Sequence, residues 1–432
     1  MSISDKDLWR TEEDDQPISK DEYWAVVDEN DRLILPPAVR EHYGFRAGAQ
    51  VLIKEGSKGL HLHRPITQLA KVYVEPTSRC NLNCRTCIRN AWEEPQGHMS
   101  PETWERVLEG VKALPSRPVI FFGGFGEPLM LTNIAAMVTQ AKAVAGKVEL
   151  ITNGILLTEQ HGRELIKSGL DTLWVSVDGV TPESYADVRI GAALPQVLEN
   201  IQRFSLLRHE TARRPEIGIA FVAMRKNIKD LPALIHMGPK LGISRFMVTN
   251  VFPYTEEMCK EMLYTRSVDG VDSTPSPWAP QIDLPRIDLD DATQDSIVKT
   301  IRNRHNVRWN GVTLGQERGR CPFIERGAIA ICWDGSVSPC LALMHQYNTF
   351  LHDTPRSVQR HVVGNINDQD LGSIWNQQEY VDFRKRVGAF DFSPCTWCGG
   401  CRWSEGNLED CFANPFPTCG GCLWAQGVIQ CP

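Results

Sequence analysis

The sequence predicts an α/β protein built on parallel strands, with a small β-rich segment before them and a cysteine-rich segment after them. Strand-like and helix-like segments alternate six times from Lys71 to about Val251. Parallel strands joined by helical crossovers produce this alternation. Glycine and polar residues follow the expected strands, where barrel-like α/β folds place their sites. Ten of the fourteen cysteines lie between Cys321 and Cys431, which indicates metal sites in that segment.

The expected strands of the central segment are short apolar runs. They cover 71–76, 118–122, 148–151, 172–177, 217–222 and 245–248. Helices are expected between or after these strands, at 101–114, 131–145, 159–168, 194–208 and 231–241. The first helix has a clear start, because Ser100 is a favoured N-cap residue and Pro101 suits the first helical position.

The N-terminal segment has its own pattern. Residues 1–23 are charged and are expected to form a flexible tail. Strands are expected at 24–27, 32–35, 51–53 and 60–63, with helical turns at 38–43. Residues 24–66 resemble the swapped-hairpin fold of AbrB-type transition regulators, through Arg32-Leu-Ile-Leu-Pro36 and the Gly44/Gly48 pair. The resemblance implies pairing of two chains, hence a homodimer, and DNA binding in many members.

Charge argues against nucleic acid as a partner here. The segment from Met1 to Arg64 holds 13 Asp/Glu and 9 Lys/Arg, and the whole chain has a net charge of −7. An acidic module binds phosphates poorly, so docking or dimerisation is the preferred role. No apolar run approaches a membrane span, and the polar N-terminus lacks a secretory signal, so we expect a cytoplasmic protein without membrane contact. In that compartment the cysteines are expected to bind metal rather than form disulfides.

Cys80, Cys84 and Cys87 follow the first expected strand at spacings typical of an iron–sulfur site. Three thiolates leave one iron of a cubane cluster without a protein ligand, and a small molecule can chelate that iron. A structural zinc site would need a fourth protein ligand. The closest histidine, His98, lies outside this loop, so the zinc alternative is disfavoured.

The loops after the first four strands together resemble the radical S-adenosylmethionine (SAM) superfamily. They contain the cysteine triad, Gly123-Gly-Phe-Gly-Glu-Pro128, Thr152-Asn-Gly154 and Ser176-Val-Asp-Gly179, with Arg189 after them. The resemblance implies a partial (β/α)6 TIM-type barrel and a SAM-cleaving [4Fe-4S] cluster on the triad. The glutamate loop would hold the SAM amino group, Ser176 or Asp178 the ribose, and Arg189 the carboxylate. The implied cofactor-binding residues are Gly124, Gly126, Glu127, Asn153, Ser176, Asp178 and Arg189.

Two positions depart from the usual superfamily pattern. Thr86 stands before the third cysteine, where an aromatic residue is common, and Phe125 interrupts the glycine pair before Glu127. Both departures concern the contact expected with the adenine.

The C-terminal segment resembles a SPASM domain, which holds auxiliary iron–sulfur clusters. The matching features are Cys321, Gly335-x4-Cys340, Gly364-Asn-Ile366, Ile374-Trp-Asn376 and Cys395-x2-Cys398. The resemblance implies one or two auxiliary [4Fe-4S] clusters, the first on Cys321 and Cys340 and the second on Cys395 and Cys398, with Cys401. The remaining ligands would come from Cys411, Cys419, Cys422 and Cys431, without a derivable pairing. Cys332 is the first choice for a purely structural cysteine, and Glu409 and Asp410 are expected to be solvated.

The expected order is therefore a tail (1–23), an AbrB-like domain (24–66), a radical SAM partial barrel (67–252), a linker or lid (253–316) and a SPASM-like domain (317–432). This combination resembles the radical SAM maturases associated with tungsten-cofactor oxidoreductases. The resemblance implies an enzyme that cleaves SAM to a 5′-deoxyadenosyl radical and modifies such an oxidoreductase or its metal-pterin cofactor. A low-potential donor such as flavodoxin or ferredoxin would supply the electron.

Two alternatives remain open at this stage. The first is a radical SAM enzyme that modifies peptides or proteins, by thioether or carbon–carbon crosslinks or as a sulfatase-type maturase. The second is a DNA-binding iron–sulfur redox sensor, which the acidic N-terminal segment and the intact SAM loops disfavour.

Overall fold

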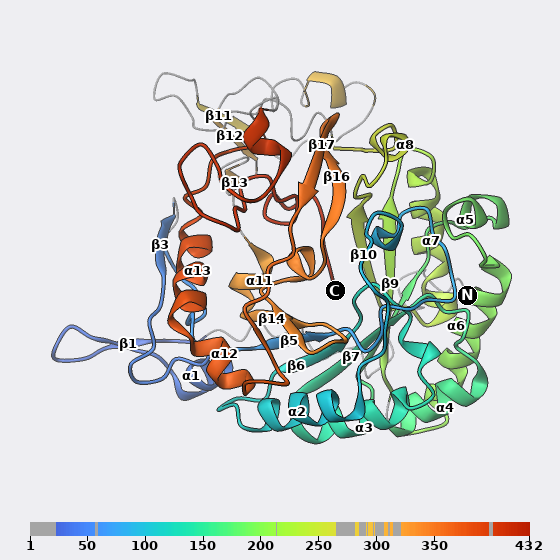
Figure 1. The fold of residues 1–432 in the computed structure, drawn as a ribbon, viewed down its shortest axis with the longest axis horizontal. Coiled ribbons are helices and arrows are strands. Elements are labelled where there is room, and N and C mark those ends of the chain that lie inside the picture. The colour runs from blue at the N-terminus through green and yellow to red at the C-terminus, as the bar shows by residue number, and fades with distance from the viewer. Residues whose placement is uncertain are drawn as a thin grey trace, which may run out of the picture. The chain divides into compact units, whose positions relative to one another are not determined.

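The computed structural model describes residues 23–56, 59–212, 214–264, 281–284, 291, 293–296, 298, 306–309, 312–313, 321–396 and 401–432. The chain divides into two compact units, Met1–Gln68 and Leu69–Pro432 (Figure 1).

The described residues of the first unit form two antiparallel strand pairs and one short helix. Strands β1 (Val26–Val27) and β2 (Leu33–Ile34) pair with each other, as do β3 (Ile53–Gly56) and β4 (Gly59–Leu62). Helix α1 (Pro37–Tyr43) ends at Gly44, whose φ of +71° favours glycine. Strands β1, β2 and β4 and helix α1 lie where the sequence predicts them, whereas β3 begins at Ile53, the last residue of the strand predicted at 51–53. The likeness to AbrB-type domains stays a prediction.

The second unit is built on a nine-stranded sheet. Six strands are parallel and follow one another in chain order, namely β5 (Lys71–Val74), β6 (Val119–Phe122), β7 (Lys147–Thr152), β8 (Thr172–Ser176), β9 (Glu216–Ala223) and β10 (Arg245–Asn250). This confirms the predicted α/β class with parallel strands. The order of the sheet runs from β10 to β18, and these two end strands do not pair with each other, so the sheet is open.

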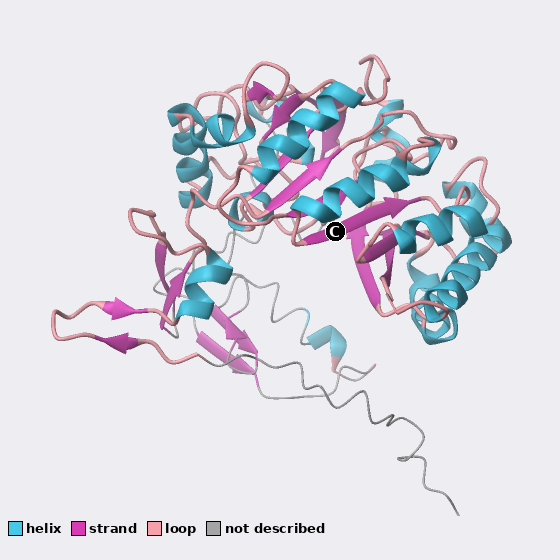
Figure 2. Cartoon of the chain, turned by 90° about the horizontal axis from the view of Figure 1, so that it is seen from below, coloured by secondary structure: helices cyan, strands magenta, loops and turns pink. Residues whose placement is uncertain are grey.

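Helices cover the outer side of this sheet (Figures 1 and 2). They are α2 (Pro101–Lys112), α3 (Ile134–Val144), α4 (Glu159–Lys167), α5 (Pro182–Val188), α6 (Leu194–His209) and α7 (Leu231–Met237). The Ser100 side chain accepts a hydrogen bond from the Thr103 N–H, which confirms the predicted N-cap of α2. The sequence reasoning missed α5. The apolar faces of the helices and sheet form one buried core that includes Val72, Ile120 and Leu173.

The C-terminal segment continues the same sheet. Strand β14 (Ala328–Ile331) pairs in parallel with β5, and β15 (Ser336–Ser338) and β18 (Gly364–Asn365) extend the sheet antiparallel. The ends of β5 and β14 therefore lie side by side. In the sequence, strands β6 to β10 lie between them. Strands β16 (Tyr347–Leu351) and β17 (Thr354–Val358) form a separate hairpin.

The remaining elements are short or surround the cysteine-rich region. The helices are α8 (Glu256–Cys259), α11 (Pro322–Glu325), α12 (Leu371–Asn376) and α13 (Gln378–Ala389). A small sheet comprises β11 (Gln281–Leu284), β12 (Asn306–Trp309) and β13 (Val312–Thr313). Most of the expected linker or lid lies outside the described residues. Among the described helices, none combines the length and apolar character needed to span a bilayer.

Candidate active site and metal centres

The three cysteines of the triad converge in the loop that follows β5. All three side chains are half-buried. Burial raises the pKa of Cys84 to about 11; Arg189 opposes this rise, whereas Cys87 and Cys80 add to it. The Cys87 N–H donates to the Cys84 carbonyl at 3.1 Å, so a tight turn brings these two cysteines together. A raised pKa means that the buried thiolate is unfavourable without a compensating positive charge. A cationic metal centre supplies that charge, so metal binding stabilises these thiolates.

An arginine that sequence reasoning missed contacts this triad. The Arg89 Nε–H donates to Cys87 Sγ at 3.3 Å, and its Nη2 donates to the Leu82 carbonyl at 2.7 Å. Burial lowers the pKa of Arg89, but Cys87 outweighs that effect and raises it. The guanidinium therefore stabilises a thiolate at Cys87. Its position two residues after the third cysteine was the available signal.

The glycine-rich loop after β6 is held against the cysteine loop. A Cβ atom on Gly126 would lie 2.0 Å from the Thr77 carbonyl oxygen, so only glycine fits there. The Glu127 N–H donates to the Arg79 carbonyl at 2.8 Å. Gly124 has a φ of +100°, which also favours glycine. The two loops thus form one rigid edge at the carboxyl ends of β5 and β6.

The Glu127 carboxylate is buried inside the protein. One oxygen accepts from Thr152 Oγ1 at 2.7 Å and from the Leu129 N–H at 3.0 Å, and the other accepts from the Asn153 N–H at 2.7 Å. Burial raises the pKa of Glu127 despite these hydrogen bonds. In this arrangement Glu127 positions the loop after β7, and its predicted contact with the SAM amino group stays a prediction.

Asn153 links the loop after β7 to the triad. Its Nδ2 donates to Asn81 Oδ1 at 2.8 Å and lies 3.7 Å from Cys80 Sγ. Three loops, those after β5, β6 and β7, therefore meet at the cysteines. This is the edge at which the sequence predicted the site.

Asp178 and Arg189 form a buried ion pair near the triad. Arg189 Nη2 lies 2.7 Å from Asp178 Oδ2. The Val222 N–H donates to Asp178 Oδ1 at 2.7 Å. Burial lowers the pKa of Arg189, but Asp178 and then Cys84 outweigh it and raise the pKa. Asp178 thus orients Arg189 beside Cys84. Ser176, the last residue of β8, is half-buried.

Arg189 also provides a test of whether these residues fit SAM. Its buried Nε–H has no hydrogen-bond partner among the described residues. A buried donor without a partner costs free energy, so a carboxylate beside it would be stabilised. The predicted pairing of Arg189 with the SAM carboxylate fits this free donor.

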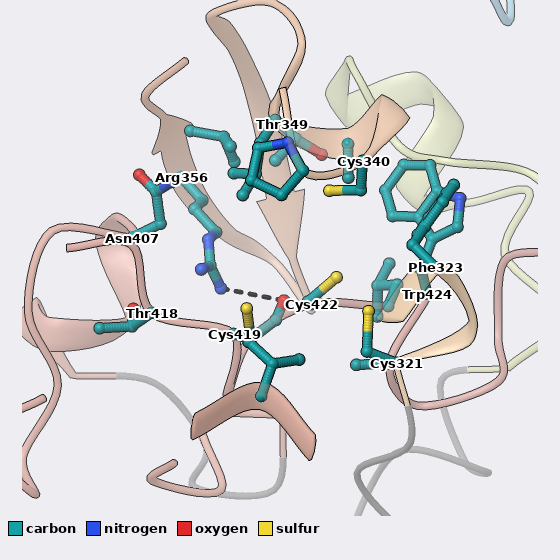
Figure 3. Close-up of a pocket in the computed structure, with 18 of the residues that line it drawn as sticks. Cys321, Phe323, Cys340, Thr349, Arg356, Asn407, Thr418, Cys419, Cys422 and Trp424 are labelled. Carbon is teal, nitrogen blue, oxygen red and sulfur yellow. Dashed lines mark hydrogen bonds between the residues drawn. The ribbon is translucent and has the colours of Figure 1, made fainter. Parts of the chain in front are cut away.

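Four further cysteines line one buried pocket in the C-terminal segment (Figure 3). Burial raises the pKa of Cys321 to about 12, and it raises the pKa values of Cys340, Cys419 and Cys422 as well. Neighbouring thiols add to the rise at Cys321, Cys340 and Cys419. Four thiolates are the ligand set of a [4Fe-4S] cluster. Sequence reasoning paired Cys321 with Cys340 but left Cys419 and Cys422 open.

A buried arginine beside this pocket was also missed. Arg356 lies on β17, and its Nη1 donates to the Gly421 carbonyl at 3.0 Å (Figure 3). A Cβ atom on Gly421 would lie 1.6 Å from that Nη1, so Gly421 leaves room for the guanidinium. Burial lowers the pKa of Arg356, and the Cys395 and Cys422 thiols oppose this. The Arg356 guanidinium can therefore offset part of the negative charge of thiolate ligands at these cysteines.

The other predicted ligands are distributed differently. Cys395 is buried with Ser393 Oγ 3.1 Å from its Sγ, and Cys411 lies near enough to raise its pKa further. Cys401 is exposed, and Cys398 lies outside the described residues. Cys431 is not among the residues that line the four-cysteine pocket. Its Sγ instead accepts a hydrogen bond from Trp424 Nε1 at 3.2 Å.

The expectation that Asp410 is solvated was wrong. Its side chain is buried and accepts hydrogen bonds from the N–H groups of Ser393, Phe412 and Asn414. These bonds satisfy the carboxylate and fix the loop that carries Cys411. Glu409 is exposed, as expected.

Comparison with known proteins agrees with this geometry. Residues 74–213 match the radical SAM superfamily, and residues 321–402 match SPASM, an iron–sulfur cluster-binding domain. The tungsten-containing aldehyde ferredoxin oxidoreductase cofactor-modifying protein of Pyrococcus furiosus is 30% identical over 366 residues, which cover 84% of this chain and 96% of that protein. The chain belongs to this family of radical SAM proteins.

Two other similarities concern the radical SAM part and the fold. A probable GTP 3′,8-cyclase of Methanococcus maripaludis (strain C7) is 30% identical over 184 residues, which cover 42% of this chain and 59% of that protein. The structure of native anSMEcpe with bound AdoMet gives a TM-score of 0.50 at 16% identity, covering 78% of this chain and 87% of that chain. This second likeness concerns the fold alone.

As a radical SAM enzyme, the protein uses a [4Fe-4S] cluster with SAM. Its SPASM domain binds auxiliary iron–sulfur clusters. The predicted enzyme class and cofactors are thereby confirmed.

Proposed function

We propose that this radical SAM enzyme modifies a tungsten-containing oxidoreductase or the metal-pterin cofactor of that oxidoreductase. The observation that supports this proposal is the similarity to the Pyrococcus furiosus cofactor-modifying protein along 96% of that protein's length. A match of this extent includes both the radical SAM and the SPASM regions, and so it concerns the whole enzyme rather than one shared module.

In this proposal, Cys80, Cys84 and Cys87 hold the SAM-cleaving cluster, and Arg89 stabilises the Cys87 thiolate. Arg189, oriented by Asp178, pairs with the SAM carboxylate. When bound, the cluster and SAM supply a 5′-deoxyadenosyl radical that abstracts hydrogen from the substrate. The remaining proposed SAM contacts come from the loops already described, through Gly124, Gly126, Glu127, Asn153, Ser176 and Asp178.

The auxiliary clusters are proposed to use two groups of cysteines. The first group is Cys321, Cys340, Cys419 and Cys422, which share one pocket. The second group is Cys395, Cys398, Cys401 and Cys411, since Cys411 is near enough to raise the pKa of Cys395 and the others lie close in sequence. This leaves Cys431 out of both groups, because it does not line the four-cysteine pocket.

Two partners complete the proposal. A low-potential donor of the flavodoxin or ferredoxin type supplies the electron for SAM cleavage, and the N-terminal unit pairs with a second copy. Exposed apolar side chains support the pairing, because Trp24 is 86% exposed, Val26 64% and Leu60 66%. Large apolar side chains left in water favour association. We also propose the cytoplasm as the location.

The function is tested by producing the tungsten oxidoreductase of the same organism with and without this enzyme. The mass of the isolated cofactor and protein, and the aldehyde-oxidising activity, are then compared. We expect a defined mass difference and higher activity with the enzyme. The Cys84→Ala variant serves as the control and should behave like the strain without the enzyme. Equal masses and activities in all strains would refute the proposed function.

A further inference from the structure

A second, smaller cluster of potential metal ligands lies beside the proposed SAM site. It consists of Glu75, Cys332 and His345, whose ligand atoms all lie within 4.8 Å of one another. All three side chains are buried, with exposed fractions of 0% for Glu75 and 1% each for Cys332 and His345. Neither the proposed SAM-cleaving cluster nor the auxiliary clusters use these residues.

The fold brings these three residues together from distant parts of the chain. Glu75 directly follows β5, and Cys332 directly follows β14, its parallel neighbour. The Glu75 N–H donates to the Ile331 carbonyl at 2.9 Å, which fixes the two strand ends in register. His345 comes from the loop just before β16. The cluster therefore rests on the sheet itself, and such support positions ligands accurately.

We propose that Glu75, Cys332 and His345 bind a divalent transition-metal ion, specifically Zn²⁺. Glu75 Oε2 lies 3.2 Å from Cys332 Sγ and 3.1 Å from His345 Nε2, and Sγ and Nε2 are 3.8 Å apart. Ligand atoms at zinc-bond lengths of about 2.0–2.3 Å in a tetrahedron are roughly 3.3–3.6 Å apart. Small side-chain adjustments thus suffice to bind the ion.

The surroundings of the three ligands are those of a metal site. His345 Nδ1 lies 2.6 Å from Glu94 Oε2, and a metal-binding histidine usually donates its second ring N–H to a carboxylate. The other oxygen of Glu75 accepts from the Phe125 N–H at 3.0 Å, so this carboxylate is also held in place. Each of these two ligands thus already has the outer partner that fixes its orientation.

The charges match a divalent cation. A Cys332 thiolate and the Glu75 carboxylate together carry two negative charges, and the ion neutralises both. Metal ligands bind in their deprotonated forms, so binding of the ion releases the thiol proton of Cys332 and leaves the His345 ring neutral.

Three protein ligands leave one coordination position for a water molecule, as in catalytic rather than structural zinc sites. The Trp92 ring lies 4.0 Å from the His345 ring, and its buried indole N–H has no hydrogen-bond partner among the described residues. A buried donor of this kind suits a metal-bound hydroxide. The site also adjoins the glycine-rich loop through the Phe125 N–H, at the carboxyl ends of β5 and β14.

The test is metal analysis of the full-length enzyme, purified without oxygen from zinc-supplemented medium. We expect about one zinc per chain, with X-ray absorption showing one sulfur and two or more nitrogen or oxygen neighbours. Cys332→Ser and His345→Gln should each lose at least about tenfold in zinc while iron content stays unchanged. Cys259→Ser, a cysteine outside these clusters, should keep its zinc.

Several results would overturn the proposal. These are wild-type enzyme that takes up no zinc, zinc retained in Cys332→Ser and His345→Gln, or an absorption spectrum without a sulfur neighbour. Mononuclear Fe²⁺ in place of zinc, seen as a high-spin ferrous signal in Mössbauer spectra, would reject zinc as the ion. If the buried variants fold poorly, Glu94→Gln provides a milder change at a partly exposed position. It should weaken zinc binding about 10–100-fold; unchanged affinity would contradict the site.

Discussion

Replacing Gly126 with alanine should separate the two loops that build the SAM site. The added Cβ atom would lie 2.0 Å from the Thr77 carbonyl oxygen, whereas ordinary contacts begin at 3.4 Å. The cysteine loop and the glycine-rich loop must therefore move apart until this distance grows from 2.0 Å to 3.4 Å. Both atoms at the contact belong to or are fixed by the backbone, so no side-chain rotation relieves it.

A displacement of about 1 Å near reacting groups can lower a rate by about 100-fold. We therefore expect Gly126→Ala to reduce 5′-deoxyadenosine formation at least about 100-fold, measured with dithionite as the reductant. The matched control is Gly406→Ala, because its Cβ atom would also meet a carbonyl oxygen, that of Ser357, but at 3.5 Å. Gly406→Ala should retain wild-type activity. A Gly126→Ala enzyme within about threefold of wild type would refute the reasoning.

Three further predictions concern the cysteine sites and one histidine. Cys84→Ala should abolish SAM cleavage and lower iron content by about a third, as expected if one of three cubes is lost; full retention of 5′-deoxyadenosine formation would reject the triad. Arg89→Gln removes a cation that donates to Cys87, so the midpoint potential of the SAM-cleaving cluster should become more negative in an EPR-monitored titration, whereas Arg402→Gln should not change it. Burial lowers the pKa of His361 from 6.5 to about 4, so the unfolded chain binds this proton more readily. Stability should therefore fall as the pH decreases from 6.5 towards 4, and His361→Phe should lessen this fall in urea midpoints; an identical pH dependence in both proteins would contradict it.

The sequence was sufficient for the central strands, because each combines an apolar run with a following glycine or polar turn. Their helical crossovers were also predictable, although α5 was missed. That helix is only seven residues long, but Thr181 and Ser184 form a capping box at its start and Pro182 occupies the first helical position. Both features mark the start of a helix in the sequence.

Long-range pairing was not predictable from local pattern. The grouping of Cys419 and Cys422 with Cys321 and Cys340 depends on how the C-terminal loops return to the sheet. Spacing alone does not determine such a return. Asp410 illustrates the same limit: a charged residue in a polar stretch is usually exposed, and only the folded loop supplies the three N–H groups that bury it.

The pairing of β14 with β5 has a consequence for biosynthesis. A ribosome must add the whole chain from Glu75 to Gly327 after β5 before β14 becomes available. Until then β5 is an edge strand with unpaired backbone groups, and such edges promote aggregation of nascent chains. Glu75 likewise lacks Cys332 and His345 during this interval. The order of synthesis thus imposes an order on assembly, in which the loop for the SAM-cleaving cluster emerges long before its supporting strand β14.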